Sequence, residues 1–301
     1  MKERLLFLFL LVNSLLYSQS FFDNSIELNK KRMLTVSSAH ALLWGGSIGT
    51  LYNVWYKNFP KTSFHFFDDS NEWQQMDKLG HIATSYQLTR TTTDLYKWTG
   101  LKPKTSALIG GTFSFSYLLS FEILDAYNKN WGFSWSDIGA NTSGILLYSV
   151  QDFFWNKQFV RPKFSYHASK LAQYRPQLLG GNKIESLLKD YNGQTYWLSF
   201  NPVGIINSTL KFPKWLNISI GYSINNQLIG DGGTFVVSNE AEQLSFTPYR
   251  QFYLSLDIDW EQIPVKSKVL KLVFRGLNMI KLPFPAIEFS NSGVKGHGVY
   301  F

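Results

Sequence analysis

The sequence has 301 residues and no cysteine, which excludes a disulfide framework and a thiolate metal site. Its formal charge is +8 at pH 7, with basic residues spread along the chain, so we expect attraction to acidic lipid headgroups. No nucleic-acid-binding motif is present, and nucleic acid is not an expected partner. Aromatic residues make up 17% of the chain, which fits an aromatic-rich core and a membrane interface equally well.

Residues 1–19 have the pattern of a secretory signal peptide. Lys2 and Arg4 precede an unbroken apolar run from Leu5 to Val12, and small and polar residues follow near a predicted cleavage site. The run is too short for an ordinary membrane span. We therefore expect export, with an uncleaved N-terminal anchor as the alternative. No lipoprotein anchor is expected on this segment, because no cysteine follows it.

The stretch 33–56 contains no Asp, Glu, Lys or Arg, and its length suits a transmembrane or deeply buried helix. Gly45, Gly46 and Gly49 have a spacing close to the small-xxx-small pattern that lets helices approach one another. His40 lies in the same stretch, and we interpret it as a hydrogen-bonded core histidine rather than a ligand.

Two further helices are predicted next. Asp77 is a good N-cap for a helix from residue 78 to about 96. The uncharged stretch 105–121 either lies at the short edge of a membrane span or forms a buried helix. It ends on Glu122 and Asp125, which are three residues apart and therefore share one helical face.

A third helix is predicted to begin near Asp137, with Ser134 or Ser136 as its cap. Asp137, Asn141 and Gly144 repeat at spacings of four and three, so they line one face of this helix. A glycine on that face permits close approach by a neighbouring helix.

After about residue 166 the apolar pattern changes to a period of two. Two segments alternate clearly and are predicted to be half-buried strands, 216–222 and 252–260. The segments 195–200 and 270–275 are weaker candidates. Pro283 and Pro285 are expected to confine the final run to an edge strand or an extended coil.

These elements predict an α+β protein. An apolar bundle of about four helices, residues 31–165, is followed by an antiparallel, strand-rich region, residues 183–301. The aromatic ending 298–301 is similar to the terminus of outer-membrane barrels, although fewer clear strands are predicted than a complete barrel needs. We expect an outer-membrane location facing the periplasm.

The polar residues occur in an ordered series: Asp77-Lys78-x-x-His81, then Glu122, then Ser134-x-x-Asp137-x-x-Ala140-Asn141-x-x-Gly144. This series resembles the VanZ-like membrane proteins and, more closely, the YfiM-type envelope proteins, a family defined by domain of unknown function 2279. The resemblance covers roughly residues 35–160. Two departures from the VanZ-like pattern are the preceding signal peptide and Asp125, which stands where a glutamine is expected. The resemblance implies an envelope location and no established reaction.

Three interpretations of the polar cluster remain open. In the first it is a structural network: Lys78 neutralises one or more of the acidic residues, and His81 and Asn141 complete the hydrogen bonding. In the second it is catalytic, with His81 as general base, Glu122 or Asp137 as its orienting group or acid, and Ser134 or Ser136 as possible nucleophiles. The members of the expected cluster are Asp77, Lys78, His81, Glu122, Asp125, Ser134, Asp137 and Asn141.

In the third interpretation His81 and the acidic residues bind a divalent cation, but Lys78 would compete with it. We therefore expect no metal and no cofactor. The main expectation is a structural or binding role toward membrane lipid or another envelope component. The alternative is a hydrolase or transferase acting on lipid or cell wall. An enzyme requires His81 to meet at least one of Glu122, Asp125 and Asp137 in an open pocket, whereas a sealed, fully paired cluster favours a structural role.

Overall fold

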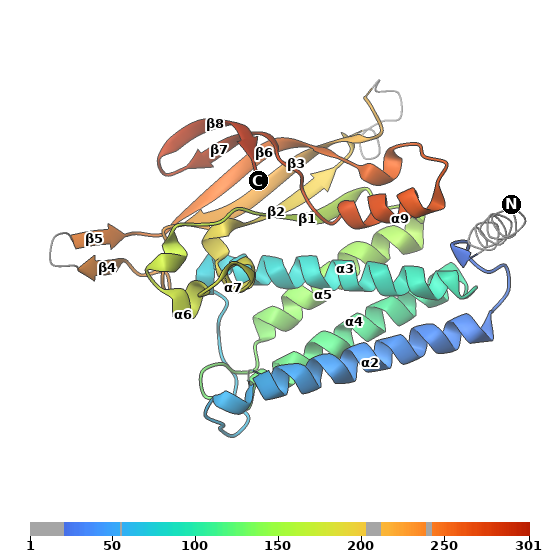
Figure 1. The fold of residues 1–301 in the computed structure, drawn as a ribbon, viewed down its shortest axis with the longest axis horizontal. Coiled ribbons are helices and arrows are strands. Elements are labelled where there is room, and N and C mark those ends of the chain that lie inside the picture. The colour runs from blue at the N-terminus through green and yellow to red at the C-terminus, as the bar shows by residue number, and fades with distance from the viewer. Residues whose placement is uncertain (1–20, 55, 203–211, 239–242) are drawn as a thin grey trace, which may run out of the picture.

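The computed structural model describes residues 21–54, 56–202, 212–238 and 243–301, so the predicted signal peptide lies outside the described residues. The α+β expectation is confirmed, because a bundle of long helices precedes an antiparallel sheet. Figure 1 shows the sheet lying along one side of the bundle, with α3 next to it and α2 and α4 farther away.

The four long helices match the predicted bundle in number and order. They are α2 (Lys30–Val54), α3 (Met76–Trp98), α4 (Pro103–Asp125) and α5 (Trp135–Trp155). α3 packs against both α4 and α5 and also contacts the first strands of the sheet, so it is the central helix of the molecule. Among the described helices, α4 alone is long and apolar enough to cross a membrane by length and composition.

Glycine controls the spacing of α3 and α5. A Cβ at Gly144 would overlap the Ser85 hydroxyl and the Ile82 carbonyl oxygen of α3, so only glycine allows this approach, as predicted. The expectation for Gly45, Gly46 and Gly49 of α2 is wrong. A Cβ at any of them would meet no atom within 4 Å, because this part of α2 contacts α4 through Trp44 and Ser47, which bond Ser120 and Tyr117, and not through its glycines.

The two predicted helix caps have different outcomes. Ser134 caps α5, because its side chain accepts a hydrogen bond from the Asp137 amide. Asp77 does not cap α3. The helix begins at Met76, two residues earlier than predicted and after three residues with positive φ, and Gln75 occupies the cap position without a side-chain bond. The Asp77 carboxylate is therefore available for tertiary contacts.

His40 of α2 is a buried, hydrogen-bonded core residue, as expected. Its Nδ1 lies 2.9 Å from the Val36 carbonyl oxygen, and its Nε2 lies 3.2 Å from the Thr92 hydroxyl of α3. The ring stacks on Tyr96 of α3. His40 therefore joins α2 to α3 and is not directed into a ligand site.

The sheet has six antiparallel strands in the order β1-β2-β3-β6-β7-β8. They are β1 (Val160–Tyr166), β2 (Gln194–Phe200), β3 (Leu216–Asn225), β6 (Tyr249–Ile258), β7 (Phe284–Ser290) and β8 (Gly293–Tyr300). A separate hairpin, β4 (Phe235–Ser238) and β5 (Gln243–Phe246), lies between β3 and β6 in sequence. The connection from β1 to β2 contains the short helices α6 (Pro176–Leu179) and α7 (Lys183–Lys189).

The strands are half-buried, as predicted, but the buried half is the polar one. In β3, Asn217, Ser219 and Ser223 are buried, whereas Ile220 between them is exposed. The same inversion occurs in β6, where Asp257 is buried and Leu256 is exposed. The sheet therefore has a polar interior face.

Two sequence expectations in this region are wrong. Residues 270–275 lie in the helix α9 (Lys268–Leu277), which Ser267 caps through the Leu270 amide. The segment containing Pro285 is also not an edge, because β7 pairs with both β6 and β8. Pro285 fits there because the β7–β8 register shifts between Phe284 and Ala286, so the ladder does not need its missing amide hydrogen.

Ion pairs attach the sheet and its C-terminal connection to the helix bundle. Arg90 of α3 is fully buried and pairs with Glu261, which follows β6. Asp94, one turn farther along α3, forms a partly exposed pair with Arg275 of α9. Because breaking the Arg90 pair would leave a buried charge uncompensated, this contact holds α3 firmly against the β-rich region.

Candidate functional site

The polar residues singled out in the sequence converge at one end of the helix bundle. The start of α3, the end of α4 and the start of α5 meet there, together with the loop that precedes α3. They surround an open pocket with a volume of about 310 Å³. Its lining residues are Tyr56, Phe67, Asp69, Glu72, Trp73, Asp77, His81, Glu122, Asp125, Trp131, Gly132, Asp137 and Tyr191.

Lys78 is the main counter-charge of the cluster. Its buried ammonium lies 2.6 Å from Asp137 Oδ1, 2.7 Å from Asp69 Oδ2 and 3.0 Å from Asp77 Oδ2. The expected neutralisation of Asp137 is therefore present. Within the part of the chain that the structure describes, Lys78 forms no ion pair with Glu122 or Asp125.

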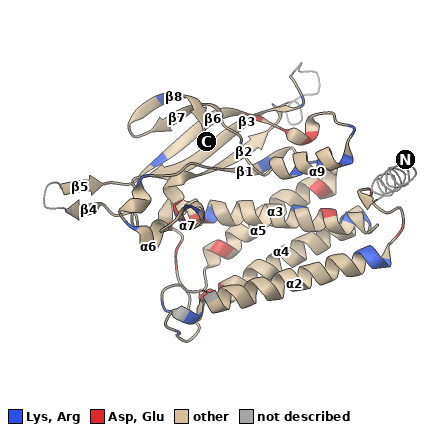
Figure 2. Cartoon of the chain, in the orientation of Figure 1, with Lys and Arg blue, Asp and Glu red and all other residues tan. Residues whose placement is uncertain are grey.

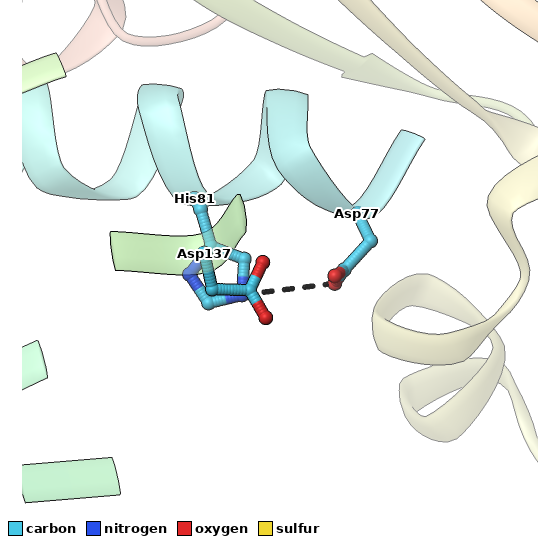
Figure 3. A group of neighbouring side chains, drawn as sticks. All are labelled: Asp77, His81 and Asp137. Carbon is cyan, nitrogen blue, oxygen red and sulfur yellow. Dashed lines mark ion pairs between the residues drawn. The ribbon is translucent and has the colours of Figure 1, made fainter. Parts of the chain in front are cut away.

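His81 lies between two of these carboxylates. Figure 3 shows its ring next to Asp137 of α5, with Asp77 one turn away on α3. His81 Nε2 lies 3.5 Å from Asp137 Oδ1 and 3.7 Å from Asp77 Oδ1. Its Nδ1 lies 3.1 Å from Asn141 Oδ1, so the predicted contact between His81 and Asn141 is present. With Nδ1 donating to the amide oxygen, Nε2 is the nitrogen that faces the carboxylates.

Ser134 has a structural position in the cluster. Its hydroxyl donates a 2.6 Å hydrogen bond to Asp69 Oδ1 and accepts a 3.0 Å bond from the Asp137 amide. Ser136 also donates to Asp69 Oδ1, at 2.6 Å. Both hydroxyls are thus used to attach the loop before α3 to the start of α5, an arrangement that does not present either serine as a nucleophile.

Glu122 and Asp125 form the α4 side of the pocket. Burial, followed by the negative charges of Asp137 and Asp125, raises the pKa of the Glu122 carboxyl to about 9. Burial likewise raises the pKa of Asp125 to about 6, against the hydrogen bond that the Tyr56 hydroxyl donates to its Oδ1 at 2.8 Å. Glu122 is therefore protonated at neutral pH, and its carboxyl O–H can donate a hydrogen bond.

The carboxyl groups around Lys78 behave differently. Burial opposes ionisation of Asp69, but hydrogen bonds from Lys78, Ser134 and Ser136 lower its pKa to about 2. Burial raises the pKa of Asp137, and the charges of His81 and Lys78 offset only part of that effect. The site thus contains a firmly ionised carboxylate, that of Asp69, and a protonated carboxyl group, that of Glu122. Their different surroundings and hydrogen-bond partners cause the difference between their pKa values.

The donor set Asp77, His81 and Asp137 has the composition of a divalent-cation site, with one ligand atom of each within 4.8 Å of the others. The fit is poor, because the Lys78 ammonium already bonds Asp77 Oδ2 and Asp137 Oδ1. A cation at this point would meet a fixed positive charge. The arrangement is better suited to proton transfer and hydrogen bonding than to metal binding.

Several site residues were not recognised from the sequence. Asp69 lies in the loop before α3, where its position beside Ser70 and Asn71 gives only a weak signal of a structured turn. Tyr56 and Trp131 lie in connections whose composition predicts no function. Tyr191, whose hydroxyl donates to Asp77 Oδ1 at 2.9 Å, comes from the connection between β1 and β2. No local pattern could have placed it at this site.

The site therefore contains all eight predicted residues. Asp77, His81, Glu122, Asp125 and Asp137 line the pocket, whereas Lys78, Ser134 and Asn141 bond to these residues. The pocket is open, which is the geometry expected of a binding or catalytic site and not of a sealed structural network.

Comparison with known proteins is consistent with the position of the site. No curated protein and no solved structure matches the chain. Residues 65–151, which include α3, α4 and most of α5, match the model of a family of predicted periplasmic lipoproteins, DUF2279. The matched region holds every predicted site residue from Asp77 to Asn141, so this part of the chain is similar to a family whose domain has no known function.

Proposed function

We propose that the protein is an exported component of the cell envelope, YfiM-type and distantly VanZ-like, held at the outer membrane and facing the periplasm. The family match, the signal-like residues 1–19 and the apolar surface of the bundle support this location. Leu34 and Leu42 of α2, Leu108 of α4 and Phe154 of α5 are each more than two-thirds exposed. Apolar surface of this extent is typical of contact with lipid or a partner.

The location is tested by separating inner and outer membranes on a density gradient and extracting each with carbonate. We expect the protein in the outer-membrane fraction after extraction. Recovery from the soluble periplasm would contradict the proposal. The sequence contains no cysteine, so the proposal does not include the lipid anchor named in the family's description.

The proposed role at the pocket is binding of an envelope component that carries an ammonium group. The observation that carries this role is the excess of carboxyl groups. The pocket is lined by Asp69, Glu72, Asp77, Glu122, Asp125 and Asp137. Among the described residues, the one ammonium that contacts these groups belongs to Lys78, which three carboxylates already share.

A ligand ammonium would compensate the remaining negative charge, because a carboxylate removed from water requires a cationic or hydrogen-bonding partner. Aromatic side chains of the pocket, those of Tyr56, Trp73 and Trp131, offer faces for the same cation. Phosphatidylethanolamine presents such a headgroup and is the membrane lipid with which we would test the site.

The test compares the thermal unfolding of the purified protein in micelles that contain phosphatidylethanolamine or phosphatidylglycerol. We expect only the ethanolamine lipid to raise Tm, and Asp125→Asn to remove that increase. Asp68→Asn is the matched control, because Asp68 is exposed in the same region but does not line the pocket. Equal stabilisation by the two lipids, or an undiminished response of Asp125→Asn, would refute ammonium recognition.

A second candidate is a lipid- or cell-wall-directed hydrolase or transferase. It is favoured by one specific observation: a protonated Glu122 and the Nε2 side of His81 face the same open pocket. His81 would accept a proton from an attacking water at Nε2 while the Asn141 amide oxygen holds its Nδ1, and Glu122 would donate a proton to the leaving group. His81→Ala tests this role: a folded variant without hydrolytic activity supports chemistry, whereas an unfolded variant supports a structural role.

A further inference from the structure

The outer face of the sheet is a continuous apolar surface. It is formed by Leu198, Ile220, Phe252, Leu254, Leu256, Ile287, Phe289, Val294 and Val299, which belong to β2, β3, β6, β7 and β8 and are between 42% and 68% exposed. Few charged residues interrupt the strands in Figure 2. A sheet in water normally buries its apolar face and exposes its polar one, so this surface requires an occupant.

The polar face is a genuine interior. Lys163 and Asp257 are almost completely buried, and their charged atoms lie 2.6 Å apart. Ser199 donates to the same carboxylate, Asp257 Oδ2, at 2.6 Å. Glu288 is likewise buried and is bonded by Gln251 at 2.9 Å and by His297 at 2.8 Å. These buried groups satisfy one another's charges and hydrogen bonds. Turning the polar face toward solvent would break this network, so the protein cannot cover its apolar surface by reversing the sheet.

The sheet also curls around this interior. Tyr300 of β8 stacks on Tyr253 of β6, and its hydroxyl lies 3.2 Å from that of Thr195 in β2. On the other side, Phe164 of β1 exchanges backbone hydrogen bonds with the segment that leads into β7, through Met279 and Lys281. Side chains of distant strands therefore meet across a polar centre, and the apolar residues are on the convex outside.

The length of the central strands matches the thickness of a lipid bilayer. β3 and β6 have ten residues each, which gives a length of about 33 Å at roughly 3.3 Å per residue. A strand of about 9–11 residues crosses the hydrocarbon layer of a bilayer. The outward-facing apolar residues, Leu216 to Tyr222 in β3 and Phe252 to Ile258 in β6, cover about 20 Å of that length at roughly 3.3 Å per residue. They therefore span about two-thirds of a hydrocarbon layer that is about 30 Å thick.

The two ends of these strands differ. Lys214 and exposed Trp215 precede β3 at one end. At the opposite end exposed Arg250 begins the outer face of β6, and its guanidinium donates a 2.8 Å hydrogen bond to Gln75 Oε1. Tryptophan concentrates at the interface of a membrane and lysine extends toward the headgroups, so the end that carries Lys214 and Trp215 is the one typical of a membrane–water interface.

The helix α9 adds an amphipathic element close to Trp215. Of its basic residues, Lys271 and Lys268 lie toward the outside, with the Lys268 ammonium 2.5 Å from Asp23 Oδ2, whereas Arg275 pairs with Asp94 of α3. Val269 and Leu272 are more than half exposed. Its C-terminal neighbour Asn278 bonds Asp259, whose amide donates to the Trp215 carbonyl oxygen. A basic helix with an exposed apolar face is suited to the headgroup region.

We propose that the convex outer face of the sheet, centred on β3, β6 and β7, lies against the acyl chains of a lipid bilayer, with α9 at the level of the headgroups. This inference deepens the proposed envelope location, on which it rests, by naming the surface that contacts lipid. It does not depend on the ligand of the acidic pocket.

The absence of cysteine makes a site-specific test direct. The full chain with Leu254→Cys or Phe289→Cys is labelled with an environment-sensitive fluorophore and reconstituted into phosphatidylethanolamine–phosphatidylglycerol vesicles. Lipids brominated on their acyl chains, and iodide in the water, then serve as competing quenchers. Leu188→Cys on α7 is the matched control, because Leu188 is 70% exposed but lies outside the sheet.

We expect brominated lipid to quench both sheet labels strongly and iodide to quench the Leu188 label. Quenching of the sheet labels by iodide alone would overturn the inference. Disulfide formation between copies of unlabelled Leu254→Cys on oxidation, together with no quenching of the labelled variant by brominated lipid, would overturn it in favour of a dimer. Because reconstitution is independent of cellular fractionation, a protein that remains in the outer membrane but shows no lipid quenching would refute this surface and leave the proposed location intact.

Discussion

Glu122 is the residue whose protonation state most directly tests the electrostatics of the site. Its carboxyl is 3% exposed and faces the charges of Asp137 and Asp125, which together raise its pKa from 4.5 to about 9. In the folded protein it keeps a proton that the unfolded chain releases above about pH 4.5. Stability is therefore lost as pH rises from that value toward 9.

The magnitude follows from the shift. One pKa unit corresponds to about 1.4 kcal/mol, and pH 7 lies about 2.5 units above the unfolded pKa. The retained proton thus costs about 3 kcal/mol of unfolding free energy at pH 7. Glu122→Gln keeps the size and hydrogen-bonding capacity of the protonated acid without this cost. We expect the variant to gain about 3 kcal/mol over the natural protein between pH 4.5 and pH 7.

The assay is denaturant unfolding in micelles, followed by tryptophan fluorescence at several pH values. Glu27→Gln is the control, since Glu27 is exposed and should show no such pH-dependent gain. Infrared spectroscopy at pH 7 should also show the carbonyl band of a protonated carboxyl that Glu122→Gln removes. A stability difference that does not change with pH, together with no such band, would refute the reasoning and indicate an ionised Glu122.

Three substitutions, with Gly139→Ala as a control, test the charge pairing, the packing and the cap around the site by denaturant unfolding. Lys78→Met leaves three carboxylates without their shared cation and should cost about 3–5 kcal/mol; an unchanged midpoint would mean that the ammonium contributes nothing. Gly144→Ala places a Cβ against the Ile82 carbonyl oxygen and should cost about 1–3 kcal/mol, whereas Gly139→Ala, in open space on α5, should gain about 0.5–1 kcal/mol. Effects of the same sign would contradict the close helix contact. Ser134→Ala removes the α5 cap and should lower stability by about 0.5–2 kcal/mol, and an unaltered Tm would argue against the cap.

Local chemistry determined much of the helical half of the molecule. The uncharged stretches predicted α2 and α4, because a long apolar segment buries its surface most simply as a helix, and polar capping residues predicted α3 and α5. Ser134 was recognisable as a cap, and Gly144 as a point of close approach, from residue type and spacing alone. The prediction that Asp77 caps α3 failed for a local reason. Trp73, Gln74 and Gln75 have positive φ values, and the helix starts directly after them, two residues earlier than predicted.

The polar cluster was predicted in membership but not in geometry. Spacing placed Glu122 with Asp125, and Asp137 with Asn141, on shared helical faces, but it could not show which carboxylate Lys78 contacts. That choice depends on how α3, α4 and α5 pack, and it brings Asp69 and Tyr191 to the site from connections outside the three helices. Such contacts join residues distant in the chain, so no periodicity in the sequence records them.

In the sheet, the sequence by itself determined that strands alternate between an apolar and a polar face, but it did not determine which face is inside. A period of two is identical for a strand with an apolar interior and for one with a polar interior. The tertiary structure decided it by pairing Lys163 with Asp257, and His297 with Glu288, across strands that are far apart in sequence. Buried charges are stable only when their partners are present. Those partners therefore determine which face of the sheet is inside. As a result, the apolar face is the one that the protein presents to its surroundings.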